Sequence, residues 1–293
     1  MTEARHGDNT VRVLDPKARG EARHGPRWIE RFNSQERLQH IMLAASVLLL
    51  MITGFPIKYA AEPWAPVATR LMGGFTIMFR IHLLCAAVMI FSGIYHLIWM
   101  GLHIRTLEWS MLPGKKDLRD AMDHFTFLLG WRRSPPDFGR FTYLEKFEYL
   151  AVFYGVLVMG LSGFVLSFPE VGAALMPRWA LDVFRVIHSN EAFVCGVAVA
   201  VGHFFWVHFH PSVFPSSTVW YKGVISEHHL AEEHPEEYRR WLAAQGESPA
   251  PAAQHHAEPG RYERSRLFIG AELLIYGAIF LWLFATFIPM FLK

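Results

Sequence analysis

Five long apolar blocks, separated by polar and charged segments, run along this chain of 293 residues. They cover residues 38–57, 77–101, 147–168, 183–208 and 267–292. Each block is long enough to cross a ~30 Å hydrocarbon core, which takes about 20 residues of helix. A soluble helical protein would rarely repeat blocks of this length five times. The pattern therefore predicts an all-α integral membrane protein with five transmembrane helices.

The polar segments divide the chain into four predicted parts. Residues 1–33 form an N-terminal tail, and residues 34–210 form a four-span bundle that begins at a helix cap near Asn33. Residues 211–266 form an amphipathic segment followed by a linker rich in Pro and Ala. Residues 267–293 form the fifth transmembrane helix. This helix contains no histidine, so we expect it to anchor the bundle.

The basic residues are distributed unevenly among the predicted loops. Of 28 Lys and Arg, 8 precede the first span, 8 lie between the second and third, and 6 lie between the fourth and fifth. The positive-inside rule then predicts a multi-pass protein of the bacterial inner membrane, with a cytoplasmic N-terminus and a periplasmic C-terminus. This distribution of Lys and Arg implies that the chain interacts with membrane lipid. Nucleic-acid binding is not needed to explain it.

The apolar spans contain histidines at matched spacings. His82 and His96 lie fourteen residues apart in the second span, and His188 and His203 lie fifteen apart in the fourth. On an α-helix these gaps place the imidazoles roughly 21 and 22 Å apart along the axis and on one face. His40, in the first span, is a fifth intramembrane histidine. Ionisable residues are costly inside a membrane and tend to be functional there.

The predicted topology pairs these histidines by depth. The second and fourth spans run in the same direction, so His82 and His188 lie near the periplasmic face and His96 and His203 near the cytoplasmic face. Neutral imidazole is an axial ligand of heme iron. Zinc would need about four ligands converging on one ion, which pairs 20 Å apart cannot provide. The pattern therefore favours two b hemes stacked across the bilayer, and we predict no catalytic residue.

Other residues refine the cofactor prediction. Arg80 and Arg185 each precede a periplasmic-side histidine by two or three residues, where a heme propionate would need a cation. An alternative role for both is interfacial anchoring. The chain has two cysteines, Cys85 and Cys195, and no C-x-x-C-H motif, which excludes covalent c-type heme on this chain.

Several of these segments resemble cytochrome b families. The first to fourth spans look like the cytochrome b (gamma) subunit of membrane-bound formate dehydrogenases, and the spacing of the histidine pairs also looks like the cytochrome b of quinol-oxidising bc-type complexes. The chain is most similar to cytochrome b/b6-domain proteins that accompany periplasmic multiheme c cytochromes. The segments that carry these resemblances are Arg37-Leu-Gln-His40 to Thr53-Gly54, Arg80-Ile-His82, Ile187-His188, Gly202-His203 to His208, Trp220-Tyr-Lys-Gly223 and His234-Pro-Glu-Glu-Tyr238.

The two resemblances imply different ligands for the cytoplasmic-side heme. The formate dehydrogenase pattern implies His40 with His203, whereas the bc-type pattern implies His96 with His203. We favour His96, because its depth mirrors that of His203, and keep His40 as the alternative or as the ligand of a third heme with His208. The resemblance also implies a quinone pocket beside this heme. The residues expected there are His40, Glu145, Lys146, Glu148 and Tyr149.

The predicted function is that of a cytochrome b subunit of a respiratory electron-transfer complex. It would move electrons through two b hemes between quinone and a periplasmic partner, either a multiheme cytochrome c or an iron–sulfur or molybdoenzyme subunit. On this prediction the chain is the electron-transfer subunit of a quinone-linked oxidoreductase. The alternatives are a heme-free transporter with a histidine proton relay and a structural membrane anchor.

Overall fold

The computed structural model describes residues 27–105, 109–210, 213–214 and 216–247. The predicted fifth span and most of the N-terminal tail lie outside the described residues. The described chain forms two units. The first comprises residues up to Val197 together with Thr218–Glu247, and the second comprises the described part of Ala198–Ser217. Each unit is considered by itself.

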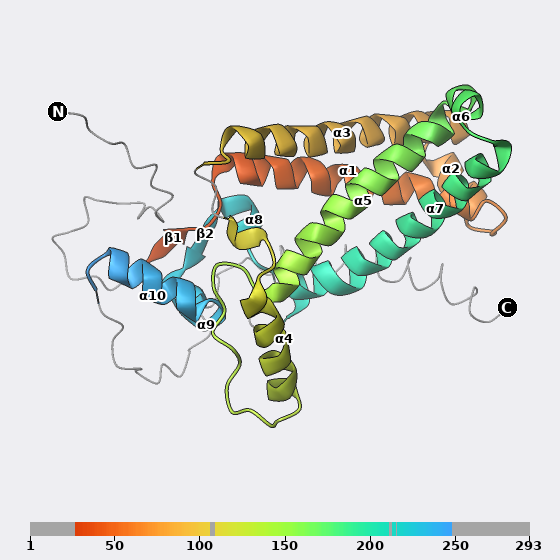
Figure 1. The fold of residues 1–293 in the computed structure, drawn as a ribbon. Coiled ribbons are helices and arrows are strands. Elements are labelled where there is room, and N and C mark those ends of the chain that lie inside the picture. Colours follow the sequence, from red (N-terminus) through yellow and green to blue (C-terminus); the bar gives the residue numbers. More distant parts are fainter. Residues whose placement is uncertain (1–26, 106–108, 211–212, 215, 248–293) are drawn as a thin grey trace, which may run out of the picture. The chain divides into compact units, whose positions relative to one another are not determined.

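The first unit contains two helical hairpins of similar construction (Figure 1). In the first hairpin, α1 (Ser34–Lys58) packs against α3 (Phe75–Leu102), and the seven-residue α2 (Ala65–Leu71) lies between them in the chain. In the second, α5 (Tyr143–Ser167) packs against α7 (Arg178–Val197), with the seven-residue α6 (Pro169–Leu175) between them. Contacts of α3 with α5 and of α1 with α7 join the hairpins into a four-helix bundle.

The sequence marks where these helices begin. Asn33 accepts hydrogen bonds from the backbone of Gln35 and Glu36, and the Glu36 carboxylate accepts from the Asn33 backbone. Thr142 and Glu145 form the same capping box at α5. Before α3 the chain turns at Gly73 and Gly74, which have φ of 84° and 92°. These left-handed conformations favour glycine because it has no Cβ.

Four helices are long and apolar enough to cross a membrane: Ser34–Lys58, Phe75–Leu102, Tyr143–Ser167 and Arg178–Phe209. They correspond to the first four predicted spans. In α3 most large apolar side chains are exposed rather than buried in a core. This is the arrangement expected where lipid, rather than water, surrounds the helices.

A small extramembrane layer covers the end of the first unit where α1 and α5 begin. It consists of β1 (Trp28–Glu30), η2 (Trp109–Met111), α4 (Lys115–Leu128), α8 (Val219–Lys222), β2 (Val224–Ser226), α9 (Glu227–Glu233) and α10 (Pro235–Ala244). The strands pair antiparallel, with Ile29 opposite Ile225. Its core contains Ile29, Ile225, Leu230, Trp241 and Leu242. The helices α8, α9 and α10 lie within the segment predicted to be amphipathic, whereas the two strands were not predicted.

Buried charges connect this layer to the spans. Arg31, which precedes α1, forms a buried ion pair with Glu237 of α10, and Arg140, which precedes α5, also pairs with Glu237. His234 Nδ1 donates to the carbonyl of Gly139 at 2.7 Å, and its Nε2 lies 3.2 Å from Arg31 Nη2. Burial, reinforced by the charge of Arg31, lowers the pKa of His234 to about 3.

The described part of the second unit continues the fourth span. Residues Ala198–His203 and Phe205–Phe209 are π-helical, and His210 is extended, with φ of −60° and ψ of 135°. The next residue in the sequence is Pro211, which disfavours a helical conformation at the residue before it. The fourth candidate span therefore ends at Phe209.

Candidate functional site

His82 of α3 faces α1. Its Nδ1 lies 2.8 Å from the hydroxyl of Thr53, whose side chain is buried. A Cβ added to Gly54 would lie 3.1 Å from His82 Cε1, so the glycine lets α1 approach the imidazole closely. Thr53 and Gly54 thus hold one edge of the ring.

His188 of α7 faces α5 in the same way. Its Nδ1 lies 2.9 Å from the hydroxyl of Ser162, which is also buried, and a Cβ on Gly163 would lie 3.1 Å from His188 Cε1. Thr53 and Ser162 occupy the same register, each five residues before the end of a 25-residue helix. The two hairpins therefore present their histidines in matching environments.

The hydrogen bonds define which nitrogen of each imidazole can bind another group. Thr53 Oγ1 donates to the carbonyl of Leu49 at 2.7 Å, and Ser162 Oγ donates to that of Val158 at 2.6 Å. Each hydroxyl has one proton, so it accepts from the imidazole Nδ1–H. We therefore assign the Nδ1–H tautomer to both rings. Their Nε2 atoms keep a lone pair, which is the arrangement of a metal-binding histidine fixed by a second hydrogen bond.

The two imidazoles are also close enough to each other to interact electrostatically. Within the ranges that the structure describes, no group of three or more His, Cys, Asp or Glu side chains could hold a bare metal ion. Heme iron requires only one imidazole on each side of a flat ring, because the porphyrin supplies its other four ligands. His82 and His188, one from each hairpin, fit that requirement.

His96, fourteen residues after His82 on α3, has both ring nitrogens engaged. Nδ1 lies 2.7 Å from Gln39 Oε1 of α1, and Nε2 lies 2.8 Å from the hydroxyl of Tyr149 of α5. The Gln39 side chain is buried, and its Nε2 has no hydrogen-bond partner among the described residues. These three side chains form a polar chain across α1, α3 and α5.

The remaining predicted ligands lie elsewhere. His40 of α1 is half-buried and packs near Trp220, with ring centroids 6.0 Å apart. His203 belongs to the π-helical part of the second unit, as does His208, which is buried. The first unit thus brings together His82 and His188 but places His96 and His40 in separate environments.

Other predicted site residues have structural contacts. Arg80 and Arg185 are exposed, and Arg185 pairs with Asp182 at 2.9 Å. Glu145 caps α5, and Lys146 forms an ion pair with Asp117 of α4 at 2.8 Å. Glu148 is half-exposed on α5. Tyr149, which was also predicted to bind quinone, differs from Glu145 and Lys146 because its hydroxyl bonds to a predicted heme ligand, His96.

The sequence prediction did not assign a role to Thr53, Ser162 or Gln39. A signal for the first two was present, because Thr53-Gly54-Phe55 and Ser162-Gly163-Phe164 repeat one local pattern in two apolar spans. A hydroxyl followed by glycine near the end of a span is suited to hold an imidazole from a neighbouring helix. Gln39 is a polar residue that the chain buries, but its sequence context gives no indication of its partner.

A family model described as Prokaryotic cytochrome b561 matches residues 31–220, more than half of the chain. No curated protein matches the chain. The chain therefore belongs to the prokaryotic cytochrome b561 family, and the predicted membership of a cytochrome b family is confirmed. The protein is accordingly a membrane b-type cytochrome that binds b-type heme and transfers electrons.

Proposed function

We propose that this member of the prokaryotic cytochrome b561 family moves electrons through two b hemes between the quinone pool and a redox partner on the other side of the bilayer. The observation that carries the proposal is the repeated arrangement of Thr53 with His82 and Ser162 with His188. When bound, a b heme supplies a reversible one-electron iron couple, while the protein supplies ligands, orientation and burial.

His82 and His188 are the proposed ligands of the first heme. Each would bind iron through Nε2, because the neighbouring hydroxyl holds Nδ1–H. A hydrogen bond from Nδ1–H to an acceptor also increases the basicity of the ligand nitrogen. Arg80 and Arg185 are exposed near these histidines in sequence and are proposed to pair with the propionates.

The second heme is proposed to have His203 as one ligand. For the other ligand the contacts of His96 favour His40, because Gln39 and Tyr149 already engage both nitrogens of His96. This reverses the preference for His96 that was drawn from the spacing of the histidines.

The π-helical turns at Ala198–His203 support the role of His203. Such turns accommodate one inserted residue, and the His188–His203 gap is one residue longer than the His82–His96 gap. A third heme, with His208, would require a further ligand.

The chain of His96, Tyr149 and Gln39 is proposed to lie at the quinone-reactive end. Tyr149 can donate a hydrogen bond to His96 Nε2 while His96 Nδ1–H donates to Gln39 Oε1, so the three side chains are linked without a charge in the membrane, and Tyr149 is the candidate acid–base group. His40 and Glu148 stay candidates for the same pocket. Glu145 and Lys146 are less suited to it, because a helix cap and an ion pair with Asp117 already use them.

The charge distribution supports the proposed location, and the resemblances to other cytochrome b families support the proposed partners. We propose that the protein lies in a bacterial inner membrane with its N-terminus in the cytoplasm and its C-terminus in the periplasm. The redox partner is a periplasmic multiheme cytochrome c or an iron–sulfur or molybdoenzyme subunit, so this chain would be the quinone-linked electron-transfer subunit of that complex.

Reduction by a quinol analogue tests the proposal. In the purified protein, decyl-ubiquinol or a menaquinol analogue should reduce the hemes, and a quinone-site inhibitor should block this. Tyr149→Phe should slow quinol reduction by about 100-fold, since general acid–base groups contribute on that scale, and should leave dithionite reduction unchanged. Tyr95→Phe is the matched control, because Tyr95 bonds to the exposed side chain of Gln35.

Two outcomes would contradict the proposal. Hemes that dithionite reduces but no quinol reduces would indicate a membrane anchor whose hemes are structural. A protein without a b-type spectrum would instead favour the transporter with a histidine proton relay.

A further inference from the structure

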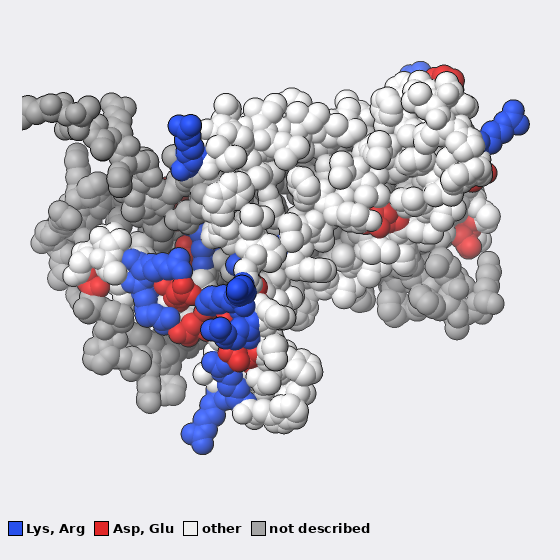
Figure 2. Space-filling view, viewed as in Figure 1, with Lys and Arg blue, Asp and Glu red and all other residues white. Residues whose placement is uncertain are grey.

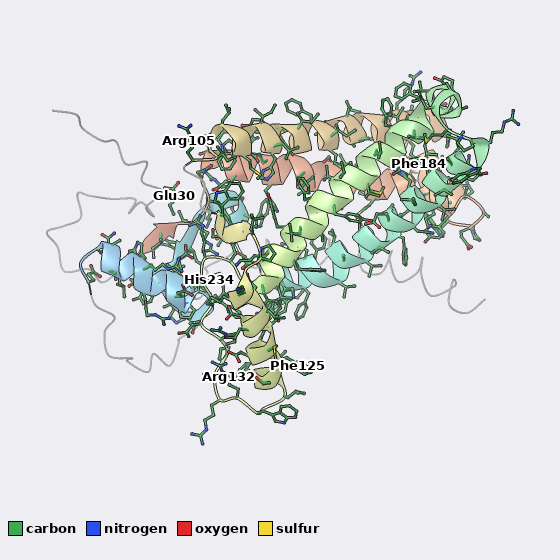
Figure 3. The ribbon with its side chains drawn as sticks, viewed as in Figure 1. Glu30, Arg105, Phe125, Arg132, Phe184 and His234 are labelled. Carbon is green, nitrogen blue, oxygen red and sulfur yellow. The ribbon has the colours of Figure 1, made fainter. Side chains whose placement is uncertain are left out.

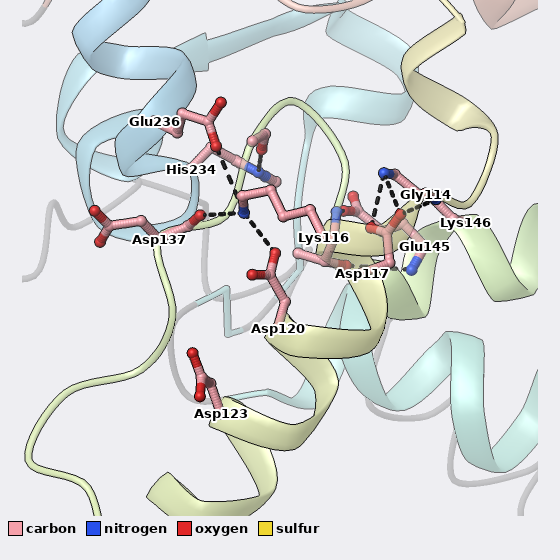
Figure 4. Close-up of polar contacts among 12 residues, drawn as sticks. Gly114, Lys116, Asp117, Asp120, Asp123, Asp137, Glu145, Lys146, His234 and Glu236 are labelled. Carbon is pink, nitrogen blue, oxygen red and sulfur yellow. Dashed lines mark hydrogen bonds and ion pairs between the residues drawn. The ribbon is translucent and has the colours of Figure 1, made fainter.

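Helix α4 lies outside the four spans and has two faces of different chemistry. On one face Lys116 bridges α4 to the segment at Asp137 and to α10, with its Nζ 2.5 Å from Asp120, 2.7 Å from the Asp137 carbonyl and 3.5 Å from Glu236 (Figure 4). Asp123, on the same face, pairs with Arg132. The charged atoms of this region gather on the side toward α9 and α10 (Figure 2).

The opposite face of α4 is an apolar stripe. Leu118, Met122, Phe125 and Leu129 recur at intervals of three and four residues, and their side chains are 46% to 70% exposed. Trp131, just after the helix, is 78% exposed. Phe125 projects from the side of α4 that faces away from α9 and α10 (Figure 3). The stripe has no cover within the described residues, and its exposure is not explained by the spans, because α4 is not one of them.

Contacts place α4 at the level where the spans begin. Asp117 in its first turn pairs with Lys146 in the first turn of α5, at 2.8 and 3.0 Å. From there α4 projects away from the bundle, across the direction of α1 and α3 (Figure 1). A helix at this level that crosses the direction of the spans would run along the bilayer surface.

Cations without ion-pair partners flank the stripe. Lys115, Arg119 and Arg133 are exposed, and none of them forms an ion pair with another described residue. An apolar stripe bordered by Lys and Arg, with Trp at its edge, is typical of helices that lie in a membrane interface containing anionic lipid. The apolar stripe matches the acyl chains, the cations match the lipid phosphates, and Trp131 matches the headgroup level between them.

We propose that α4 is an in-plane membrane helix that binds anionic lipid. The stripe of Leu118, Met122, Phe125 and Leu129 inserts into the boundary between headgroups and acyl chains, while Lys115, Arg119 and Arg133 bind lipid phosphates. Through Lys116, this surface also holds α10 and the segment at Asp137 against the bilayer. The inference does not depend on the hemes or their ligands.

Spin-label accessibility tests the proposal in the full-length protein in nanodiscs. Labels are introduced by Met122→Cys and Phe125→Cys on the stripe and by Asp123→Cys on the opposite face, in a background of Cys85→Ala and Cys195→Ala. Oxygen concentrates in lipid, whereas a nickel chelate stays in water. The ratio of oxygen to nickel accessibility should be several-fold higher at 122 and 125 than at 123. An unchanged heme spectrum confirms that each variant is folded.

A second comparison tests the preference for anionic lipid. Adding phosphatidylglycerol to phosphatidylcholine nanodiscs should move the labels at 122 and 125 deeper into the bilayer. Combined Lys115→Glu, Arg119→Glu and Arg133→Glu substitutions should abolish that movement. Labels at 122 and 125 that are as accessible to nickel as the label at 123 would overturn the proposal. So would labels shielded from both reagents, which would indicate a covering protein surface, or insertion that is independent of phosphatidylglycerol.

Discussion

Thr53 Oγ1 lies 2.8 Å from Nδ1 of His82, and the hydroxyl is itself committed to donating to a carbonyl of its own helix. The imidazole must therefore donate through Nδ1 and keep its Nε2 lone pair for another group. Ser162 and His188 repeat this relationship in the second hairpin. Two histidines held in one tautomer, one from each hairpin, are the axial ligands that we propose for a b heme.

Removing either hydroxyl should weaken heme binding without removing a ligand. Thr53→Val keeps the shape of the side chain but offers no acceptor to His82, and Ser162→Ala does the same at His188. Loss of such a partner costs about 10- to 100-fold in metal affinity. Heme retention against apomyoglobin should therefore fall on that scale. Ser46→Ala is the control, because the buried Ser46 hydroxyl donates to the Leu43 carbonyl of its own helix. Equal heme retention in all three variants would contradict the account.

A methyl group at either close glycine should displace an imidazole. Gly54→Ala and Gly163→Ala would each place Cβ 3.1 Å from a histidine Cε1, closer than ordinary contact allows. We expect reduced heme content, measured as absorbance per protein, in both variants. Gly101→Ala meets nothing within 4 Å and should retain full heme content, with α3 stabilised by up to about 1 kcal/mol. Full heme content in the first two variants would show that the close contact is unimportant.

The extramembrane layer should depend on the buried ion pair of Arg31 and Glu237. Glu237→Ala leaves the Arg31 guanidinium buried without its carboxylate, which typically costs about 3–5 kcal/mol. Hydrogen exchange of α9 and α10 should accelerate accordingly. Arg240→Ala breaks an exposed ion pair with Glu236. It should change the opening free energy measured by hydrogen exchange by less than about 1 kcal/mol. Similar effects of the two substitutions would contradict the assigned role of burial.

Acid should loosen the same layer through His234. Its folded pKa of about 3 lies below the ~6.5 of an unfolded histidine, so the unfolded segment takes up a proton first as the pH falls. The contribution of neutral His234 to the stability of the layer is complete above about pH 6.5. It declines toward pH 3 by about 1.4 kcal/mol per pH unit. Hydrogen exchange of residues 227–247 should therefore rise between about pH 7 and pH 5, after correction for intrinsic rates. His234→Gln should flatten this dependence; a parallel profile in both proteins would exclude His234 as its cause.

The sequence was sufficient to predict the four spans that the structure describes, because lipid requires long apolar helices whose backbone groups are satisfied internally. The depth of His82 and His188 followed from the same helices. Their second hydrogen bonds did not, because Thr53 and Ser162 are adjacent to them only through packing between helices. The engagement of His96 by Gln39 and Tyr149 depends on three helices at once, and spacing within α3 cannot reveal it.

Local structure also limited the sequence prediction. β1 and β2 are three residues each and lie almost 200 residues apart in the chain, so no local periodicity indicates their pairing. The π-helical turns before His203 change the phase of the fourth span, which a uniform α-helix does not reproduce. The angle between two histidines about the helix axis can therefore be predicted from sequence more dependably for His82 and His96 than for His188 and His203.

Heme stoichiometry of ligand variants tests the central claim most directly. The pyridine hemochrome assay on the purified protein should give two b hemes per chain, and His82→Ala or His188→Ala should each leave one. The double variant should also leave one, because both histidines are proposed to bind the same iron. Full heme content in either single variant, or loss of both hemes in the double variant alone, would contradict the account.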